Sequence, residues 1–190
     1  MVGSQIVSEA RLRGHQVVAI TRNGTEVAGA ESVSADISDL QTFRKVANES
    51  DVVVVSIPPA RDGGDHKPLL DAHKKISKTT IPARVFVVGG AGALRVGDSL
   101  LKDAPSFPVA FKAEAETMTK IFQEYSAPND LDWTMLAPAP VIRPGERTGA
   151  YVVGSDAPVG DSISSQDFAV AVLDEIENPR HMKKRFAVAN

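Results

Sequence analysis

Glycine and arginine occupy two positions of this chain at which a phosphate group could be bound. Gly3 opens a run of apolar residues with helical spacing, and Arg22 ends a β-branched run. Glycine lets backbone N–H groups approach a phosphate, and the first turn of a helix adds a favourable dipole. Arginine offers a planar fork of donors that matches phosphate oxygens. These positions suggest a phosphate-bearing ligand, although Gly3 alone could be a flexible terminal residue and Arg22 an exposed residue after a strand.

Other groups with reactive chemistry are few. The chain has no cysteine, which excludes disulfides, a thiol nucleophile and thiolate metal sites. Asp62, Asp65 and His66 share a glycine-rich loop, but their spacing matches no metal motif known to us, so we expect no metal site. The sequence lacks a G-x-S-x-G motif, which argues against a hydrolase. We expect the remaining histidines at the surface: His15, His73 and His181.

Size and charge narrow the class of protein. A chain of 190 residues is typical of one domain with a sizeable core. The net charge of −3 argues against a nucleic-acid partner, because phosphate-backbone binding needs an excess of basic residues. The longest apolar run, residues 168–173, is too short to cross a membrane, and no signal peptide is visible. We therefore expect a soluble, cytoplasmic protein.

Strand and helix patterns alternate along the chain. The β-branched or apolar runs predict strands at residues 16–22, 32–35, 51–57, 84–90 and 132–138. Helical spacing predicts helices over residues 4–13, 38–47, 68–76 and 109–125, and from about 164 to just before Pro179. Ser38 with Gln41, and Ser164 with Asp167, fit the capping-box pattern at two helix starts.

This alternation predicts the fold class. Residues 51–57 and 84–90 are apolar through their middle, as in strands buried on both faces of a parallel sheet. Alternating strands and helices form right-handed βαβ units, so we expect an α/β fold with an open, doubly wound parallel sheet. Residues 1–190 form one domain in this prediction. The Pro- and Gly-rich stretch 138–149 leads into a small C-terminal lobe from about residue 139.

Several longer segments carry a family resemblance. They are VGSQIVSEARLRGHQVVAITRN, ADISD, DVVVVSIPP, VFVVGGAGAL, LDWTMLAPAPVIRPGERTG and ISSQDFAVAVLDEIENPRH. With these segments the chain resembles the NmrA-like, NAD(P)H-binding branch of the atypical short-chain dehydrogenases/reductases, a branch that includes NADH-flavin reductases. The resemblance spans nearly the whole chain. It implies a Rossmann-like NAD(P)-binding fold with strand order 3-2-1-4-5-6.

The front of the chain departs from that pattern. The family places a strand and G-x-x-G-x-x-G before the first helix, and here Gly3 fits the third glycine while the first strand is missing. Without a central strand, residues 17–20 and 52–55 would have unpaired edges, which is costly for buried backbone. We expect either that the sequence starts late, or that the chain is shortened and its sheet closes up or pairs with a second chain in a homodimer.

The resemblance also assigns the cofactor-binding residues. Arg22, assisted by Asn23, would bind the 2′-phosphate, which favours NADP(H) over NAD(H). Asp36 and Ile37 would lie against the adenine, although Asp36 could equally serve the entry of the next helix. The crevice at the carboxyl ends of the strands would be lined by Ser56, Ile57, Pro58, Gly89 and Gly90, and Pro138 would lie near the nicotinamide.

The usual general acid of the superfamily is not visible. Neither Tyr125 nor Tyr151 is followed four residues later by lysine, and Phe111-Lys112 stands where relatives carry Tyr-Lys. Lys112 could bind the nicotinamide ribose or be a solvated lysine. A carbonyl acceptor needs a proton donor, whereas a flavin or quinone can take its proton from water. We therefore expect an NADPH-dependent reductase of a flavin (FMN or FAD), a quinone or a similar acceptor.

Two alternatives to the reductase stay open. The protein could be a non-catalytic NADP(H)-binding redox sensor or partner-binding protein. The chain could also bind no cofactor at all without the missing strand.

Overall fold

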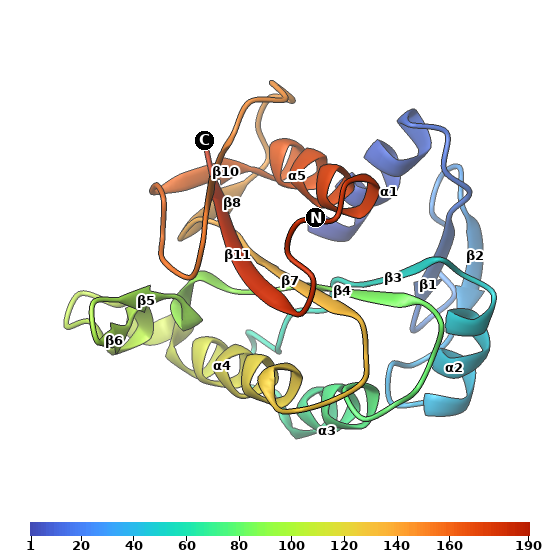
Figure 1. Ribbon diagram of the computed structural model, residues 1–190, viewed down its shortest axis with the longest axis horizontal. Helices are drawn as coiled ribbons and strands as arrows, with labels where there is room; N and C mark the ends of the chain where they lie inside the picture. Colours follow the sequence, from blue (N-terminus) through green and yellow to red (C-terminus); the bar gives the residue numbers. More distant parts are fainter.

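The computed structural model describes residues 1–190 as a three-layered α/β fold (Figure 1). A central five-stranded sheet has the order β3-β4-β7-β11-β9. Its strands are β3 (Val52–Val55), β4 (Arg84–Val88), β7 (Trp133–Ala137), β11 (Lys184–Ala189) and β9 (Val152–Gly154). The first four are parallel and only β9 runs antiparallel, on β11. The predicted α/β class with a parallel sheet is confirmed.

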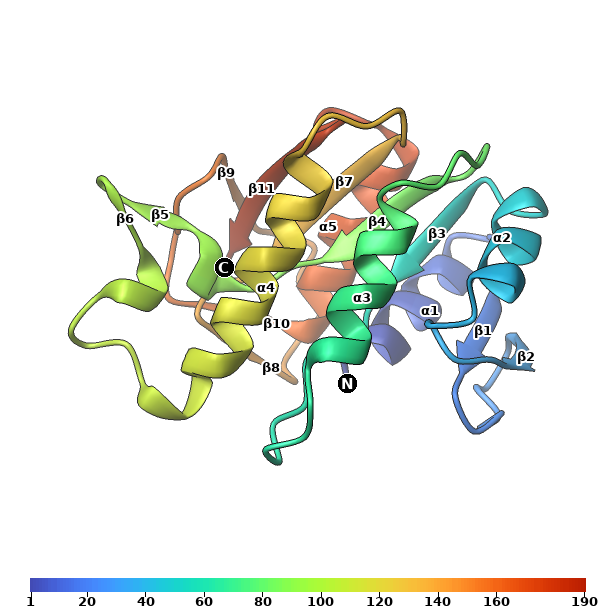
Figure 2. The same ribbon diagram turned by 90° about the horizontal axis from the view of Figure 1, so that it is seen from below.

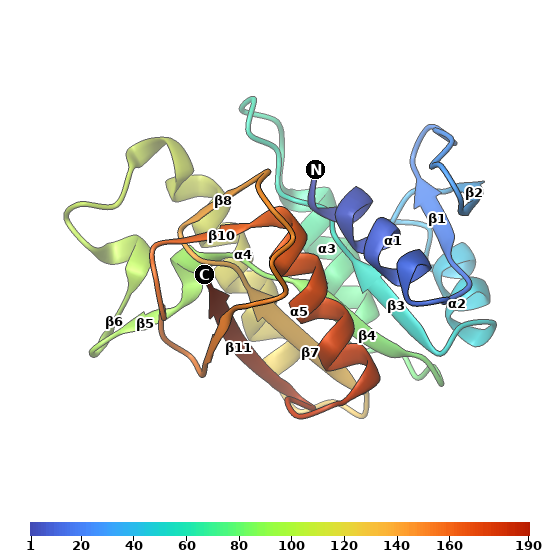
Figure 3. The same ribbon diagram turned by 90° about the horizontal axis from the view of Figure 1, so that it is seen from above.

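Helices cover both faces of this sheet. One face carries α3 and α4 with α2 beside them (Figure 2), and the other carries α1 and α5 (Figure 3). Their bounds are α1 (Val2–Leu12), α2 (Leu40–Asn48), α3 (Lys67–Ile76), α4 (Lys112–Ser126) and α5 (Ser165–Glu177). Three short 3-10 turns lie between β4 and α4: η1 (Ala91–Ala93), η2 (Leu101–Asp103) and η3 (Val109–Phe111). None of the helices has both the length and the apolar character that crossing a membrane requires.

A second, two-stranded sheet stands beside the central one. It pairs β1 (Val18–Thr21) with β2 (Glu31–Ser34) in parallel register. No backbone ladder joins β1 to β3, so the sheet does not close up across this place. Each of these strands therefore has one edge without a strand partner, and Val18 and Ile20 of β1 are 45% and 39% exposed.

The C-terminal part of the chain adds a small lobe at one end of the sheet. It contains the parallel pair β8 (Val141–Arg143) and β10 (Ser162–Ser164). A hairpin of β5 (Arg95–Val96) and β6 (Ser99–Leu100) projects from the same end of the molecule (Figure 3). The backbone N–H of Arg95 donates to the carbonyl of Asp156, which ties this hairpin to the loop after β9.

The core consists of two main apolar clusters, one on each face of the sheet. Phe86 and Leu136 contribute to the cluster under α1 and α5, whereas Val85 and Met135 contribute to the cluster under α3 and α4. These neighbours in sequence point to opposite faces because side chains alternate along a strand. Burial of β4 on both faces confirms the prediction for residues 84–90.

Helix ends follow the predicted signals only in part. Ser164 accepts from the backbone N–H of Asp167 at the start of α5, as predicted. At α2 the predicted cap at Ser38 is wrong, because Asp39 accepts from the N–H groups of Gln41 and Thr42. Ser38 instead donates through both N–H and hydroxyl to the Asp36 carboxylate. Aspartate and serine are comparable N-caps, so the local sequence did not decide between adjacent candidates.

Two features were absent from the sequence-based prediction. The strand β11 was not predicted, although it lies between β7 and β9 and is buried along residues 185–189. His73 was predicted at the surface and is 1% exposed, so that prediction is wrong. Its Nδ1 lies 3.0 Å from the Tyr125 hydroxyl, inside the layer between α3 and α4. Trp133, which was expected in the core, is 3% exposed.

The buried His73 makes stability depend on pH. Burial lowers the pKa of His73 to about 4, whereas the unfolded chain titrates near 6.5. The unfolded state then binds more protons below pH 6.5, so stability falls as the pH drops from 6.5 towards 4. At pH 5 we expect a loss of about 2 kcal/mol in the free energy of unfolding from this residue.

Urea unfolding of the wild type and of His73→Gln at pH 7 and pH 5 tests this. Glutamine can still accept from Tyr125 but does not titrate, so the variant should lose less stability between the two pH values. His15→Gln is the control, at a half-exposed histidine that pairs with Glu177, and it should not reduce the stability lost between pH 7 and pH 5. An equal loss in wild type and His73→Gln would contradict the assignment.

Candidate functional site

The predicted cofactor residues gather at the carboxyl ends of the parallel strands. Arg22 follows β1, Asp36 follows β2, Ser56 follows β3 and Gly89 follows β4. Figures 2 and 3 both show the ends of β1 and β3 facing the side of the molecule where the N-terminus lies. Parallel strands bring their carboxyl ends to one edge, which is where open α/β sheets bind ligands.

The start of α1 lies against the end of β3. A Cβ built on Gly3 would stand 3.6 Å from the Ser56 hydroxyl oxygen, which is an ordinary contact distance. The first turn of α1 and the end of β3 are therefore neighbours, as the Rossmann interpretation of Gly3 requires. Packing does not demand glycine at this position, because an alanine side chain would fit.

Gly89 and Gly90 follow β4 and differ in how much space they have. A Cβ on Gly89 would stand 3.0 Å from Met135 Cγ and 3.2 Å from the carbonyl oxygen of Leu136, so packing on β7 favours glycine there. A Cβ on Gly90 would make a 3.4 Å contact with Met118 of α4. The chain after β4 thus passes close to both β7 and α4.

Lys112 is the first residue of α4 and lies near this part of the edge. Ala115, one turn further along α4, packs directly on Gly92 of η1, the turn that follows Gly90. The Lys112 side chain is exposed and makes no ion pair in the structure. Its ammonium group is free to meet a ligand, which agrees equally with a binding role and with a solvated lysine.

Arg22 and Asp36 form the second part of the candidate site. The Arg22 and Asn23 side chains are exposed, and the Arg22 guanidinium has no hydrogen-bond or ion-pair partner. Hydrogen bonds from Ser38, with a smaller effect of the Arg22 charge, lower the pKa of the Asp36 carboxyl. The Asp36 Oδ1 accepts both bonds from Ser38, so Oδ2 is left for another donor. Ile37 beside it is half-buried against the apolar cluster under α3 and α4.

The remaining predicted residues differ in exposure. Ile57 and Pro58 are exposed after β3, whereas Pro138 is buried after β7. Little of the Pro138 surface is therefore available to a ligand.

Side-chain hydrogen bonds to α4 hold the loop after β3 beside the candidate site, a connection that the sequence analysis did not make. Residues 58–66 extend past the end of β3, and Arg61 makes two hydrogen bonds of 2.7 and 2.8 Å to Glu114 of α4. His66 Nδ1 lies 2.7 Å from the Thr117 hydroxyl and its Nε2 lies 2.7 Å from the carbonyl oxygen of Ala60. Both ring nitrogens of His66 are thus engaged within the protein. The pairs Arg61–Glu114 and His66–Thr117 are each separated by more than fifty residues, so periodicity could not reveal them.

Neither tyrosine of the chain stands at this edge. Tyr125 is fully buried beside His73 at the other end of α4. The Tyr151 hydroxyl donates to Asp174 of α5 at 2.6 Å. Phe111 occupies the position just before Lys112 and is 49% exposed. The structure therefore offers no phenol near the predicted cofactor residues.

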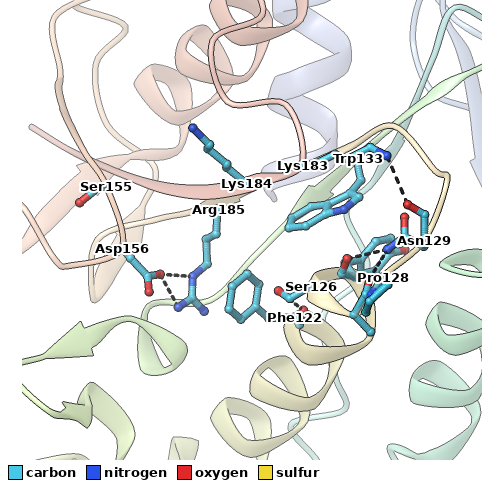
Figure 4. A pocket seen from close by; sticks show the side chains of 12 residues that line it. Phe122, Ser126, Pro128, Asn129, Trp133, Ser155, Asp156, Lys183, Lys184 and Arg185 are labelled. Atoms are coloured by element: carbon cyan, nitrogen blue, oxygen red, sulfur yellow. Dashed lines mark hydrogen bonds and ion pairs between the residues drawn. The ribbon is translucent and has the colours of Figure 1, made fainter.

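Two concave regions lie elsewhere. A cavity of about 420 Å³ opens at the amino ends of β7 and β11, the opposite edge of the sheet (Figure 4). There the Arg185 guanidinium stacks on the Phe122 ring at 3.7 Å and pairs with Asp156. A second cavity of about 620 Å³ lies in the C-terminal lobe beside Thr148 and Asp167. Neither includes a predicted cofactor residue, so we place the candidate site at the carboxyl edge on chemistry and topology.

Comparison with known proteins identifies the family of the chain. A family model described as NAD(P)H-binding matches residues 1–179. The uncharacterized protein YwnB of Bacillus subtilis is 35% identical over 201 residues, covering 99% of this chain and 93% of the relative.

Two solved structures have a similar fold along the whole chain. A candidate NADH-flavin reductase of Streptococcus pneumoniae superposes with a TM-score of 0.85 at 29% identity, covering 100% of this chain and 94% of the other. A candidate exported protein of Burkholderia pseudomallei gives 0.84 at 34% identity, with 100% and 95% covered. Because the matched family model covers residues 1–179, the chain belongs to the NAD(P)H-binding family.

Proposed function

We propose that this protein is an NADPH-dependent oxidoreductase that transfers hydride to a flavin, a quinone or a similar conjugated acceptor. The observation that carries the proposal is the pair of features at the carboxyl edge: an exposed, unpartnered Arg22 after β1, and glycine-lined strand ends after β4. The family membership and the similarity to a candidate NADH-flavin reductase support it. We also propose that the chain belongs to the NmrA-like branch, which its sequence segments resemble.

The residues present fit a nicotinamide dinucleotide. Arg22 would bind the 2′-phosphate with Asn23 beside it, and Asp36 Oδ2 would accept from the exocyclic amine of the adenine. Gly3 at the start of α1 would let backbone N–H groups reach the pyrophosphate, next to Ser56. Gly89, Gly90 and Lys112 would border the nicotinamide half.

The chemistry proposed needs no acid from the protein. A bound NADPH would supply the hydride for the acceptor, and solvent would supply the proton that completes reduction of a flavin or quinone. The protein's contribution is to hold the acceptor over the cofactor, because orientation alone lowers the barrier of a bimolecular transfer substantially. Placement of Tyr125 and Tyr151 away from the edge favours such an acceptor over an aliphatic carbonyl.

The same observation supports a second candidate function. A site that lacks a general acid could belong to a protein that binds NADP(H) and senses redox state without turnover. Binding and turnover measurements on the wild type separate the two functions.

Removing the Arg22 guanidinium should weaken the binding of NADPH more than the binding of NADH. A charge-assisted phosphate contact contributes about 1.5 kcal/mol or more, so we expect Arg22→Ala to raise the Kd for NADPH about tenfold. The Kd for NADH should change less than twofold, since NADH lacks the 2′-phosphate. Titration followed by nicotinamide fluorescence measures both.

Arg44→Ala is the matched control for this substitution. It removes the same charge from an exposed position of α2, so both dissociation constants should stay at the wild-type value. An equal weakening of NADPH and NADH by Arg22→Ala would refute the assignment of the 2′-phosphate to this residue.

Turnover should depend on the acceptor rather than on a protein acid. We expect steady NADPH oxidation with FMN or menadione, and none with an unconjugated aliphatic ketone. Phe111→Tyr places a phenol on an exposed position beside Lys112, and kcat with menadione should stay within about twofold because protonation does not limit the transfer. Saturable NADPH binding without oxidation by any of these acceptors would favour the sensor function instead.

A further inference from the structure

A buried carboxylate on α1 is held by an arginine of the distant C-terminal lobe. Glu9 is 4% exposed and accepts from Arg147 Nε at 2.7 Å and from Arg147 Nη2 at 2.8 Å. Arg13, one turn further along α1, donates to the same carboxylate at 2.8 Å. These hydrogen bonds, those from Arg147 first, lower the pKa of Glu9 in spite of its burial. Glu9 is therefore a carboxylate, and both of its oxygens accept hydrogen bonds from arginine.

The loop that carries Arg147 is itself fixed to α5. The Asp167 carboxylate, which is 0% exposed, accepts from the backbone N–H groups of Thr148 and Gly149 at 2.8 Å and from the Thr148 hydroxyl at 2.7 Å. Arg147 is consequently not a freely moving surface arginine. It reaches Glu9 from a loop whose next two residues are anchored.

Charge balance at this junction depends on Arg147. Arg13 also donates to Asp174 and to Glu177 of α5, each at 2.8 Å. Without Arg147, one guanidinium would face three carboxylates, and Glu9 would be repelled from the carboxylates of α5. Like charges at such distances in a partly buried site are costly.

A displacement of α1 at Glu9 would also move the first turn of this helix. Glu9 lies six residues after Gly3, which is about 9 Å along a helix, and a helix of this length moves as a rigid rod. That first turn lies beside the end of β3, since a Cβ built on Gly3 would stand 3.6 Å from the Ser56 hydroxyl oxygen. The helix α1 packs on α5 through Ile6 and Ala10 and is joined to the loop of Arg147 through Glu9, so these contacts set the position of Gly3.

We infer that Arg147 is a positioning residue for cofactor binding, which fixes the first turn of α1 through Glu9. The inference rests on the proposed function. It implies that Arg147 influences the pyrophosphate and nicotinamide half of the ligand, which depends on α1. The adenosine 2′-phosphate half, which depends on Arg22 after β1, is independent of it.

Two ligands separate these halves. NADPH contains both, whereas adenosine 2′-monophosphate contains only the part that Arg22 and Asp36 would bind. For Arg147→Met we expect the Kd for NADPH to rise about fivefold, in the range of couplings between linked sites, and the Kd for adenosine 2′-monophosphate to stay within about twofold. Arg147→Lys keeps the charge and should recover most of the NADPH affinity. Isothermal titration calorimetry measures all of these constants.

A control shows whether lost stability alone has the same effect. Arg185→Met breaks a buried ion pair and ring stack at the opposite edge of the sheet (Figure 4), so it removes stability without touching α1. Both dissociation constants should then match the wild type. If Arg147→Met does not fold, Arg147→Lys must still raise the Kd for NADPH about twofold and leave the fragment unchanged.

Several outcomes would overturn the inference. An unchanged Kd for NADPH in the Arg147 variants, an equal weakening of both ligands, or the same change in Arg185→Met would each do so while NADPH binding by the wild type stands. Failure of the wild type to bind either ligand would instead refute the proposed function.

Discussion

Burial of β4 on both faces is the constraint on which the rest of this structure depends. Residues 84–87 of this strand are all buried, and its backbone pairs with β3 on one side and β7 on the other. A strand of this kind must have helices on both faces, since neither face can meet water without exposing large apolar side chains. The α3–α4 layer and the α1–α5 layer follow from it. Parallel pairing then brings the ends of β3, β4 and β7 to one edge, where the ligand chemistry gathers.

The pairing of strands in the central sheet ends at β3. The strands β1 and β3 each have an edge without a strand partner, and an unpaired edge is a weak point in a sheet. Ion pairs join α1 to the elements around it. Glu9 and Arg13 on α1 meet Arg147 of the lobe and the carboxylates of α5. Such a network is directional, because each guanidinium must meet its carboxylate at one geometry.

Some features of the candidate site follow from the topology of the sheet, and others do not. Strand ends, glycines and the free Arg22 guanidinium suit a dinucleotide, and they are consequences of the topology. Other features near this edge do not follow from the topology: Phe111 and Lys112 at the start of α4, and the loop after β3 that Arg61 and His66 join to α4. Because no phenol stands at this edge, the chemistry open to the protein is narrower than the fold alone would allow.

The sequence by itself determined the fold class, the doubly buried strand near residues 84–90, most helices, and the edge at which Arg22, Ser56 and Gly89 lie. These follow from local apolar patterns and from the rule that parallel strands end together. A strand near residues 51–57 is confirmed, but its predicted burial on both faces is wrong, because β3 ends the central sheet and only Val55 is fully buried. Only the tertiary structure decided the burial of His73 against Tyr125, the central position of β11, and the pairing of Glu9 with Arg147. His73 lies on a helix beside the charged residues Lys74 and Lys75, and the apolar run before Asn190 covers only residues 186–189. The pair Glu9 and Arg147 is separated by 138 residues. Local patterns report a residue's neighbours in sequence, whereas burial and ion pairing depend on which distant elements the packing brings together.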